Sequence, residues 1–299
     1  MTDSISTSAF KQVDVFTSVP LMGNALAVIL DAEGLDGATM QRIAAWTNLS
    51  ETAFVLPTTQ AQADYRVRIF TPRSELDFAG HPSVGTAHAL LEAGRIEAKD
   101  SLVQECAAGL LPMRVVGDGE ARRIFVQAPR ASLRPCDSDV VQLVAAAIAA
   151  APSSGNLPAL VDLGITWLVC MLDSEARVRA LAPDMDAVAA LCTRVGAVGL
   201  SVFGCASNTD DFAIAVRAFC PGDGVPEDPV TGSANAAIGA YLHANGALDS
   251  IGPQYRASQG RELGRDGYVT VRVDRASGAV EIGGNSVTCI DGIMQLPER

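Results

Sequence analysis

Val67-Arg68-Ile69-Phe70-Thr71-Pro72 recurs as Val216-Arg217-Ala218-Phe219-Cys220-Pro221, 149 positions further along the chain. Other matches keep the same order at distances of 148 to 152 positions: Val13-Asp14 with Val161-Asp162, Phe54 with Phe203, Gly80 with Gly232, Leu90 with Leu242, Gly94 with Gly246 and Gly109 with Gly260. An ordered series at nearly constant distance indicates two copies of one fold within the chain. The small drift in distance is typical of loop insertions.

Both copies predict the same elements. Runs rich in Val, Ile and Phe predict strands over 13–16, 28–30, 53–56, 65–70, 161–163, 167–172, 200–203 and 212–219. Asp36 is placed to cap a helix with Met40, Ile43, Ala44 and Trp46 on one face, and its counterpart spans 184–195. A second helix in each half runs from Gly80 to Gly94 and from Gly232 to Gly246, where glycine suits a left-handed C-cap.

The end of each half predicts a hairpin, over 109–116 with 123–128 and over 267–273 with 279–282. An alanine-rich helix over 138–151 joins the halves. We therefore expect an α/β (α+β) fold of two pseudo-symmetric lobes, the first over 8–128 and the second over 129–285.

The charge of the chain excludes several classes of partner. Its 22 basic and 34 acidic residues give a net charge of −12, and the basic residues form no cluster. Phosphate contacts by Lys and Arg supply most nucleic-acid affinity, so we expect no nucleic-acid partner. An anionic membrane surface is disfavoured for the same reason. A small anionic ligand stays compatible, because it needs only a few local donors.

Cysteine and histidine usage points to a reduced, metal-free protein. The seven cysteines are scattered without a CxxC pair, and the three histidines have no metal-ligand spacing. Residues 1–11 are polar, and no apolar run is long enough to cross a bilayer. We expect a cytoplasmic protein without a metal site or cofactor.

The second helix of each half begins at a glycine followed by small residues, which predicts anion binding. Free backbone N–H groups and the helix dipole attract negative charge there, and glycine permits close approach. Most helix N-termini bind nothing, but two related copies would direct two such starts at one cleft. The candidate substrate-binding residues are Gly80, Ser83, Gly232 and Ser233.

Positions where the copies differ indicate chemistry, because catalysis usually needs asymmetry and packing does not. Glu51 stands where the second copy has Leu200, at the start of a strand. His81 stands opposite Ser233, and Asp228 precedes the second helix start. The structural alternatives are a solvated Glu51, a turn-forming Asp228 before proline and a helix-capping His81. Arg68 and Arg217 match so well that we interpret them first as structural.

At these motifs the sequence resembles the PhzF-like isomerases of phenazine biosynthesis. The resemblance rests on Val13-Asp14-Val15-Phe16-Thr17, Ser50-Glu51-Thr52-Ala53-Phe54, Gly80-His81-Pro82 and Asp228-Pro229-Val230-Thr231-Gly232-Ser233, and it runs to about Gly284. It implies the diaminopimelate-epimerase-like fold, with each sheet wrapped around a central helix. A C-terminal strand over 286–298 is expected to return to the first lobe, and a homodimer is expected.

The resemblance also implies a cofactor-free proton transfer in a cleft between the lobes, on a small carboxylic acid. Glu51 matches the proton shuttle of the family, and His81, Asp228 and Ser233 match polar residues around the substrate. Two alternatives stay open. Related racemases and epimerases place a cysteine at each helix start, where this chain has His81 and Ser233, so a two-thiol racemase is disfavoured. A noncatalytic protein of the same fold that binds a small acid is the other alternative.

Overall fold

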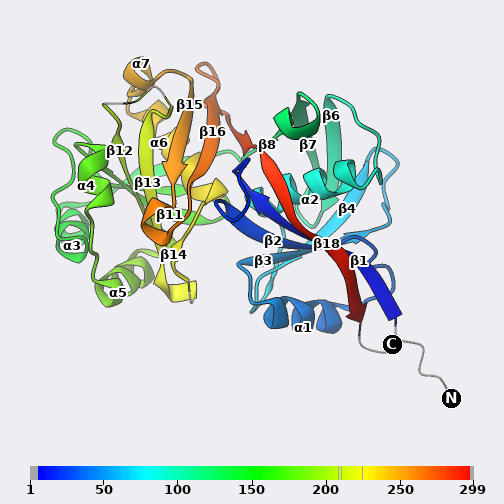
Figure 1. The fold of residues 1–299 in the computed structure, drawn as a ribbon. Helices are drawn as coiled ribbons and strands as arrows, with labels where there is room; N and C mark the ends of the chain where they lie inside the picture. The colour runs from blue at the N-terminus through cyan, green and yellow to red at the C-terminus, as the bar shows by residue number, and fades with distance from the viewer. Residues whose placement is uncertain (1–5, 208, 210, 224, 297–299) are drawn as a thin grey trace. The chain divides into compact units, whose positions relative to one another are not determined.

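The computed structural model describes residues 6–207, 209, 211–223 and 225–296, which divide between two units (Figure 1). Unit 1 ends at Val126 and resumes at Gly283, and unit 2 comprises Gln127–Ile282. The sequence predicts 8–128 with 286–298 for the first lobe and 129–285 for the second. Of the predicted C-terminal strand, 297–298 lie outside the described residues.

Unit 1 is built on a mixed sheet. Its strands are β1 (Ser6–Val15), β2 (Asn24–Ile29), β3 (Glu51–Leu56), β4 (Tyr65–Phe70), β5 (Glu75–Leu76), β6 (Ser101–Cys106), β7 (Gly109–Val116), β8 (Arg123–Gln127) and β18 (Ser286–Leu296). They pair in the order β18-β1-β2-β3-β4-β6-β7-β8, with β5 also on β4. The β2–β3 and β4–β6 pairs are parallel and the others antiparallel. Strand β18 thus returns to β1, as Figure 1 shows.

Unit 2 repeats this pattern. Its strands are β9 (Ser132–Pro135), β10 (Ala159–Asp162), β11 (Thr166–Leu172), β12 (Gly199–Cys205), β13 (Ile214–Cys220), β14 (Val225–Asp228), β15 (Gln254–Gln259), β16 (Gly267–Val273) and β17 (Val280–Gly284). The order is β9-β10-β11-β12-β13-β15-β16, with β14 also on β13, and the parallel pairs are β11–β12 and β13–β15. Strands β10–β16 therefore correspond one by one to β1–β7, in agreement with the predicted duplication.

A buried helix lies at the centre of each unit. Helix α2 (Gly80–Glu92) packs against β1, β2, β3 and β18, and every residue from His81 to Leu91 is buried. Helix α6 (Gly232–Ala244) packs against β10, β11, β12 and β16. Both begin at the predicted glycine, and the left-handed Gly94 and Gly246 follow their ends with φ of 64° and 70°. The apolar faces of each sheet are thus buried around one central helix.

The remaining helices lie at the edges of the units. They are α1 (Gly37–Thr47), α3 (Ser138–Ala147), α4 (Glu175–Arg179), α5 (Met185–Val195) and α7 (Leu248–Ile251). Asp36 caps α1 as predicted, and Asp184 caps α5, which begins one residue after the predicted start. The prediction of a helix over 138–151 was too long. The carbonyl of Ala147 instead accepts a hydrogen bond from the Asp184 N–H, and Ala149 adopts a left-handed φ of 52°.

The prediction for Trp46 was wrong. Met40, Ile43 and Ala44 are buried, whereas 78% of Trp46 is exposed. At 100° per residue Trp46 lies well outside the arc of the other three side chains. It lines a groove of about 790 Å³ in unit 1 together with Phe10 on β1 and Ile293 on β18.

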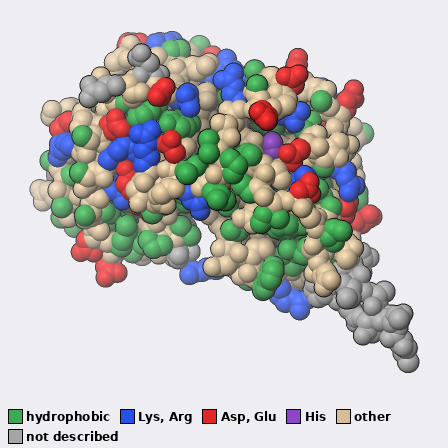
Figure 2. All heavy atoms as spheres, viewed as in Figure 1, with side chains coloured by type: hydrophobic (Ala, Val, Ile, Leu, Met, Phe, Trp, Pro, Cys, Tyr) green, Lys and Arg blue, Asp and Glu red, His purple; other side chains and the backbone are tan. Residues whose placement is uncertain are grey.

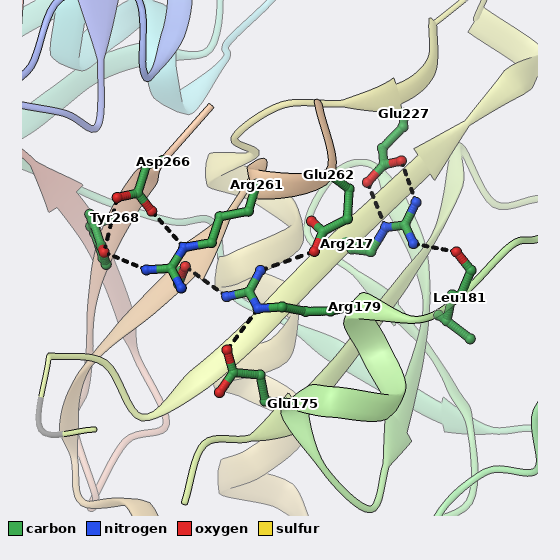
Figure 3. A network of polar contacts seen from close by, with 10 residues as sticks. Glu175, Arg179, Leu181, Arg217, Glu227, Arg261, Glu262, Asp266 and Tyr268 are labelled. Carbon is green, nitrogen blue, oxygen red and sulfur yellow. Dashed lines mark hydrogen bonds and ion pairs between the residues drawn. The ribbon is translucent and has the colours of Figure 1, made fainter. Parts of the chain in front are cut away.

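An arginine–glutamate ion pair joins equivalent strands in the two units, β4 and β5 in unit 1 and β13 and β14 in unit 2. Arg68 donates to both carboxylate oxygens of Glu75, at 2.6 and 2.7 Å. Arg217 donates to both oxygens of Glu227, at 2.8 and 2.7 Å, and to the carbonyl of Leu181 (Figure 3). The pairing supports the structural interpretation of both arginines. In unit 1 the pair is partly exposed, whereas the side chains of Arg217 and Glu227 are only 8% and 6% exposed.

The surface shows no marked separation of charge on the face in Figure 2, where basic and acidic side chains are interspersed. Within the part of the chain that the structure describes, no helix is both long enough and apolar enough to span a membrane.

Candidate active site

Glu51 is placed by the connection between α1 and β3. Asn48 ends the helix in a left-handed conformation, with φ of 53°, and the chain then turns into β3 at Glu51. The hydroxyls of Thr47 and Thr52 lie 2.8 Å apart and tie the helix end to the strand start. Thr52 is fully buried, so the alternation of a strand turns its neighbour Glu51 to the opposite face. The Glu51 side chain is 16% exposed.

His81 lies in the first turn of α2, close to β1 and β2. The helix approaches these strands so closely that a Cβ on Gly85 would lie 2.7 Å from both Leu26 Cδ2 and Val15 Cγ2. Leu26 is also the partner of Glu51 in the parallel β2–β3 register. The packing therefore brings the start of α2 to the start of β3. Nε2 of His81 lies 3.4 Å from Oε2 of Glu51.

The environment of His81 is unusual for a histidine. It is 6% exposed, and burial lowers its pKa from 6.5 to about 3. The imidazole is therefore neutral at ordinary pH. Its buried Nε2 has no hydrogen-bond partner among the described residues, although Glu51 is near. A buried polar atom in this state suggests a group that receives its partner from a ligand or during catalysis.

The start of α2 is open to an anion. Ala79, the N-cap residue, has no polar side chain and makes no cap hydrogen bond. The backbone N–H groups of Gly80 and His81 belong to the first turn, which has no intrahelical acceptors for them. The N-terminal end of α2 thus lies next to Glu51 and His81, and anion binding at Gly80 stays a prediction.

Ser83 occupies a different position from its neighbours. It is fully buried, and its hydroxyl donates to the Ala79 carbonyl and accepts from Gln104 Nε2, at 2.8 and 2.9 Å. The Gln104 amide oxygen in turn accepts from the Tyr65 hydroxyl. The structure gives Ser83 internal partners, and its predicted contact with substrate stays a prediction.

Unit 2 gathers the other predicted residues at the start of α6. Asp228 ends β14, and its Oδ2 accepts a 2.6 Å hydrogen bond from the Thr231 hydroxyl. Gly232 is the buried first residue of α6, and the hydroxyl of Ser233 accepts a 3.1 Å hydrogen bond from the Trp167 indole. A carboxylate, a hydroxyl and a helix N-terminus thus lie within one segment of six residues.

Sequence reasoning missed three residues that organise this segment: Trp167, Thr231 and Gln259. The Gln259 amide bonds to Thr231, to Asn235 and to the Asp228 carbonyl. A signal was available, since Gln259 directly precedes the repeated Gly260, whereas Ala108 precedes Gly109 in the first copy. The same comparison of unlike positions that selected Glu51 would have selected Gln259.

Other features offer weaker sites. Among the described residues, no group of His, Cys, Asp and Glu is arranged to hold a metal ion. The groove beside Trp46 has Arg42 as its charged lining residue and does not include Glu51 or His81. In the described structure none of the seven cysteines forms a disulfide, and none stands at the start of α2 or α6.

The chain is similar to known proteins over nearly its whole length. Residues 13–292 match the family model of phenazine biosynthesis-like proteins (PhzC-PhzF). The chain is 37% identical to antisense-enhancing sequence 1 of Schizosaccharomyces pombe, covering 95% of this chain and 97% of the relative. It is 34% identical to the trans-2,3-dihydro-3-hydroxyanthranilate isomerase of Pseudomonas aeruginosa, covering 94% and 96%.

Solved structures show the same fold. The crystal structure of a PhzF-family protein from Bacillus anthracis matches with a TM-score of 0.84 at 27% identity, covering 98% of this chain and all of that one. A hydroxyproline epimerase from Agrobacterium vitis matches in fold alone, with a TM-score of 0.64 at 16% identity, covering 97% and 92%. The predicted epimerase-like fold and the predicted isomerase class are thereby confirmed. From its sequence, its duplicated fold and these relatives, the chain belongs to the phenazine biosynthesis-like (PhzC-PhzF) family of isomerases.

Proposed function

We propose that this protein is a cofactor-independent isomerase that moves a proton within a small carboxylic acid. The observation that supports it best is the contact between Glu51 and His81, 3.4 Å apart and largely shielded from water. A carboxylate held in this way beside a neutral imidazole is suited to remove a proton from a bound substrate. Proton transfer by such a positioned group is general acid–base catalysis.

In the proposed reaction, the substrate carboxylate binds at the helix starts, Gly80 in unit 1 and Gly232 with Ser233 in unit 2. Glu51 removes a proton from a carbon whose C–H bond is acidified by an adjacent unsaturated system. The proton returns to a different atom of the same skeleton. One C–H bond breaks and one bond to hydrogen forms, so the reaction needs no oxidant or reductant.

His81 and Asp228 complete the proposed chemistry. Neutral His81 would hydrogen-bond to Glu51 or to the substrate through Nε2, which has no hydrogen-bond partner among the described residues. Asp228, at the start of α6, would serve as the second proton-handling group. The substrate class follows the Pseudomonas aeruginosa relative, whose name gives trans-2,3-dihydro-3-hydroxyanthranilate as substrate. We propose a small cyclic carboxylic acid of this kind for the present chain.

The two alternatives are weaker. A two-thiol racemase needs a cysteine at each helix start, and this chain has His81 and Ser233 there. The binding-protein alternative is disfavoured by the largely buried Glu51 carboxylate beside His81 Nε2, which has no hydrogen-bond partner among the described residues. The small-acid substrate, the absence of a nucleic-acid partner and the homodimer stay predictions.

The variant Glu51→Gln tests the proposal. It keeps shape and hydrogen-bonding capacity but removes the base. With trans-2,3-dihydro-3-hydroxyanthranilate as the first substrate, we expect turnover to fall by about 10²–10⁴-fold while ligand affinity is retained. The exposed Glu97→Gln in the same unit is the matched control and should turn over like wild type. Near-normal turnover in Glu51→Gln would contradict the mechanism and favour the binding-protein alternative.

A further inference from the structure

A closed hydrogen-bond network surrounds the start of α6. Its side chains come from Asp228, Thr231, Asn235 and Gln259. Thr231, Asn235 and Gln259 are 7%, 0% and 1% exposed. Asn235 Nδ2 donates to the Thr231 carbonyl at 2.8 Å and to Gln259 Oε1 at 3.0 Å. Within the network Asp228 is the one member that the proposed reaction uses.

The direction of each hydrogen bond follows from one fixed donor. The backbone N–H of Thr231 can only donate, and it lies 3.1 Å from Gln259 Oε1, which identifies that atom as the amide oxygen. Gln259 Nε2 therefore donates, at 2.9 Å to the Thr231 hydroxyl and at 3.0 Å to the Asp228 carbonyl. Because Thr231 Oγ1 accepts from Gln259, its own hydrogen is available for Asp228 Oδ2 at 2.6 Å.

Both neighbours of Asp228 are also fixed in place. The preceding Glu227 is bound through both oxygens by Arg217, a pair almost completely buried (Figure 3). The following Pro229 packs against Gly260, where a Cβ would lie 2.6 Å from the Pro229 carbonyl oxygen. The backbone of Asp228 thus has little freedom, and the network determines where its carboxylate points.

The fold itself does not require this arrangement. In unit 1 the N-cap of α2 is Ala79, which has no hydroxyl, although Gln104 donates to Ser83 and Ser83 donates to the Ala79 carbonyl in a related network. Helix α2 nevertheless begins at the corresponding glycine and has the same length as α6. The N-cap of α6 differs from that of α2 by a hydroxyl that is hydrogen-bonded to a carboxylate, and this difference is better explained by the reaction than by folding.

We propose that Thr231, oriented by Gln259, is a positioning residue that holds the Asp228 carboxylate as a hydrogen-bond acceptor in the orientation that the reaction uses. This inference rests on the proposed function, because it assigns Asp228 a part in the chemistry. Thr231 acts through Asp228 and does not itself exchange a proton with substrate. Loss of its hydroxyl removes the hydrogen bond that orients Oδ2 of the carboxylate.

The test compares kcat and KM for Thr231→Val, Thr231→Ser and Asp228→Asn with trans-2,3-dihydro-3-hydroxyanthranilate. Thr231→Val keeps the side-chain shape and should lower kcat by about 10–100-fold with little change in KM, because misplacement of a catalytic group acts on the chemical step. Thr231→Ser restores the hydroxyl and should recover most of the kcat. Thr86→Val is the control, since Thr86 is fully buried and its hydroxyl has no partner among the described residues.

Each outcome separates this inference from the proposed function. Wild-type kcat in Thr231→Val, combined with a large loss in Asp228→Asn, would overturn the positioning role alone. Equal losses in Thr231→Val and Thr231→Ser would also overturn it, since the hydroxyl would then be irrelevant. Wild-type turnover in Asp228→Asn would contradict the role that the proposed function gives this residue. If Thr231→Val does not fold, Thr231→Ala replaces it, because Ala79 is accepted at the same position of α2.

Discussion

His81 is an imidazole that the fold keeps neutral. Burial lowers its pKa from 6.5 to about 3, so between these values the unfolded chain binds a proton that the folded chain does not. The contribution of neutral His81 to stability is therefore complete above pH 6.5 and is lost as the pH falls toward 3. At about pH 5 the expected loss is about 2 kcal/mol relative to neutral pH.

Urea unfolding of wild type and His81→Gln at neutral pH and at about pH 5 measures this contribution. As the pH is lowered over this range, we expect the free energy of unfolding to fall by about 2 kcal/mol less in His81→Gln than in wild type. His88, whose pKa burial also lowers, is present in both proteins and cancels in the comparison. The same pH dependence in both proteins would mean that His81 is solvated in solution.

The cysteines are predicted to take no part in the reaction. Burial raises the pKa of Cys136 to about 11 and that of Cys170 to about 12, and it also raises the pKa of Cys106 and Cys205. Thiols with raised pKa values are poor nucleophiles at neutral pH. Treatment of the folded protein with iodoacetamide should therefore leave turnover unchanged. Stoichiometric inactivation by one modified thiol would revive the racemase alternative.

Candidate site residues could be predicted from the sequence where the two copies differ. Their hydrogen-bond partners could not be predicted where those partners come from distant strands. Glu51 opposite Leu200 and His81 opposite Ser233 were visible as asymmetries, and the structure brings Glu51 and His81 together. The internal partners of Ser83 were not visible, because Gln104 and Tyr65 reach it only through the β4–β6 register. Hydrogen bonds of this kind depend on pairing that a single sequence does not specify.

At the level of elements, the duplicated ion pair makes a quantitative prediction. The Arg217–Glu227 pair is almost fully buried, and removal of one partner leaves an unpaired buried charge. We expect Arg217→Met to lower the free energy of unfolding by about 3–5 kcal/mol. Arg68→Met breaks the equivalent pair of unit 1, which is 28% and 36% exposed, and should cost about 0–1 kcal/mol.

Chemical denaturation of both variants gives the comparison directly, because the two substitutions remove the same interaction from equivalent strands. Equal destabilisation by Arg68→Met and Arg217→Met would show that burial does not distinguish the pairs. A wild-type free energy of unfolding in Arg217→Met would imply that Glu227 finds another partner or becomes solvated.

The elements themselves were largely predictable because their signals are local. Runs rich in Val, Ile and Phe marked the strands, Asp36 marked the start of α1, and glycines marked both ends of α2 and α6. Two errors came from tertiary contacts. Helix α3 ends early because Asp184 binds the carbonyl of Ala147, and β1 begins at Ser6 because it pairs with β18. Neither contact can be inferred from residues near it in the chain.

At the level of the whole molecule, the repeat explains how one chain supplies two unlike half-sites. Both units follow the same strand order, with a buried helix that begins at a glycine. Unit 1 adds Glu51 and His81, and unit 2 adds Asp228 with its hydrogen-bond network. The relatives match this chain over nearly its full length, so both units are present in them.

The central claim is that these half-sites act on one small acid. A crystal structure of Glu51→Gln soaked with trans-2,3-dihydro-3-hydroxyanthranilate tests it most directly, because the variant should bind without turnover. We predict one ligand molecule whose carboxylate accepts from the backbone N–H groups at the starts of α2 and α6. Its acidic carbon should lie beside residue 51, with His81, Asp228 and Ser233 in contact. A ligand that contacts only one unit, or that binds away from residue 51, would contradict the account.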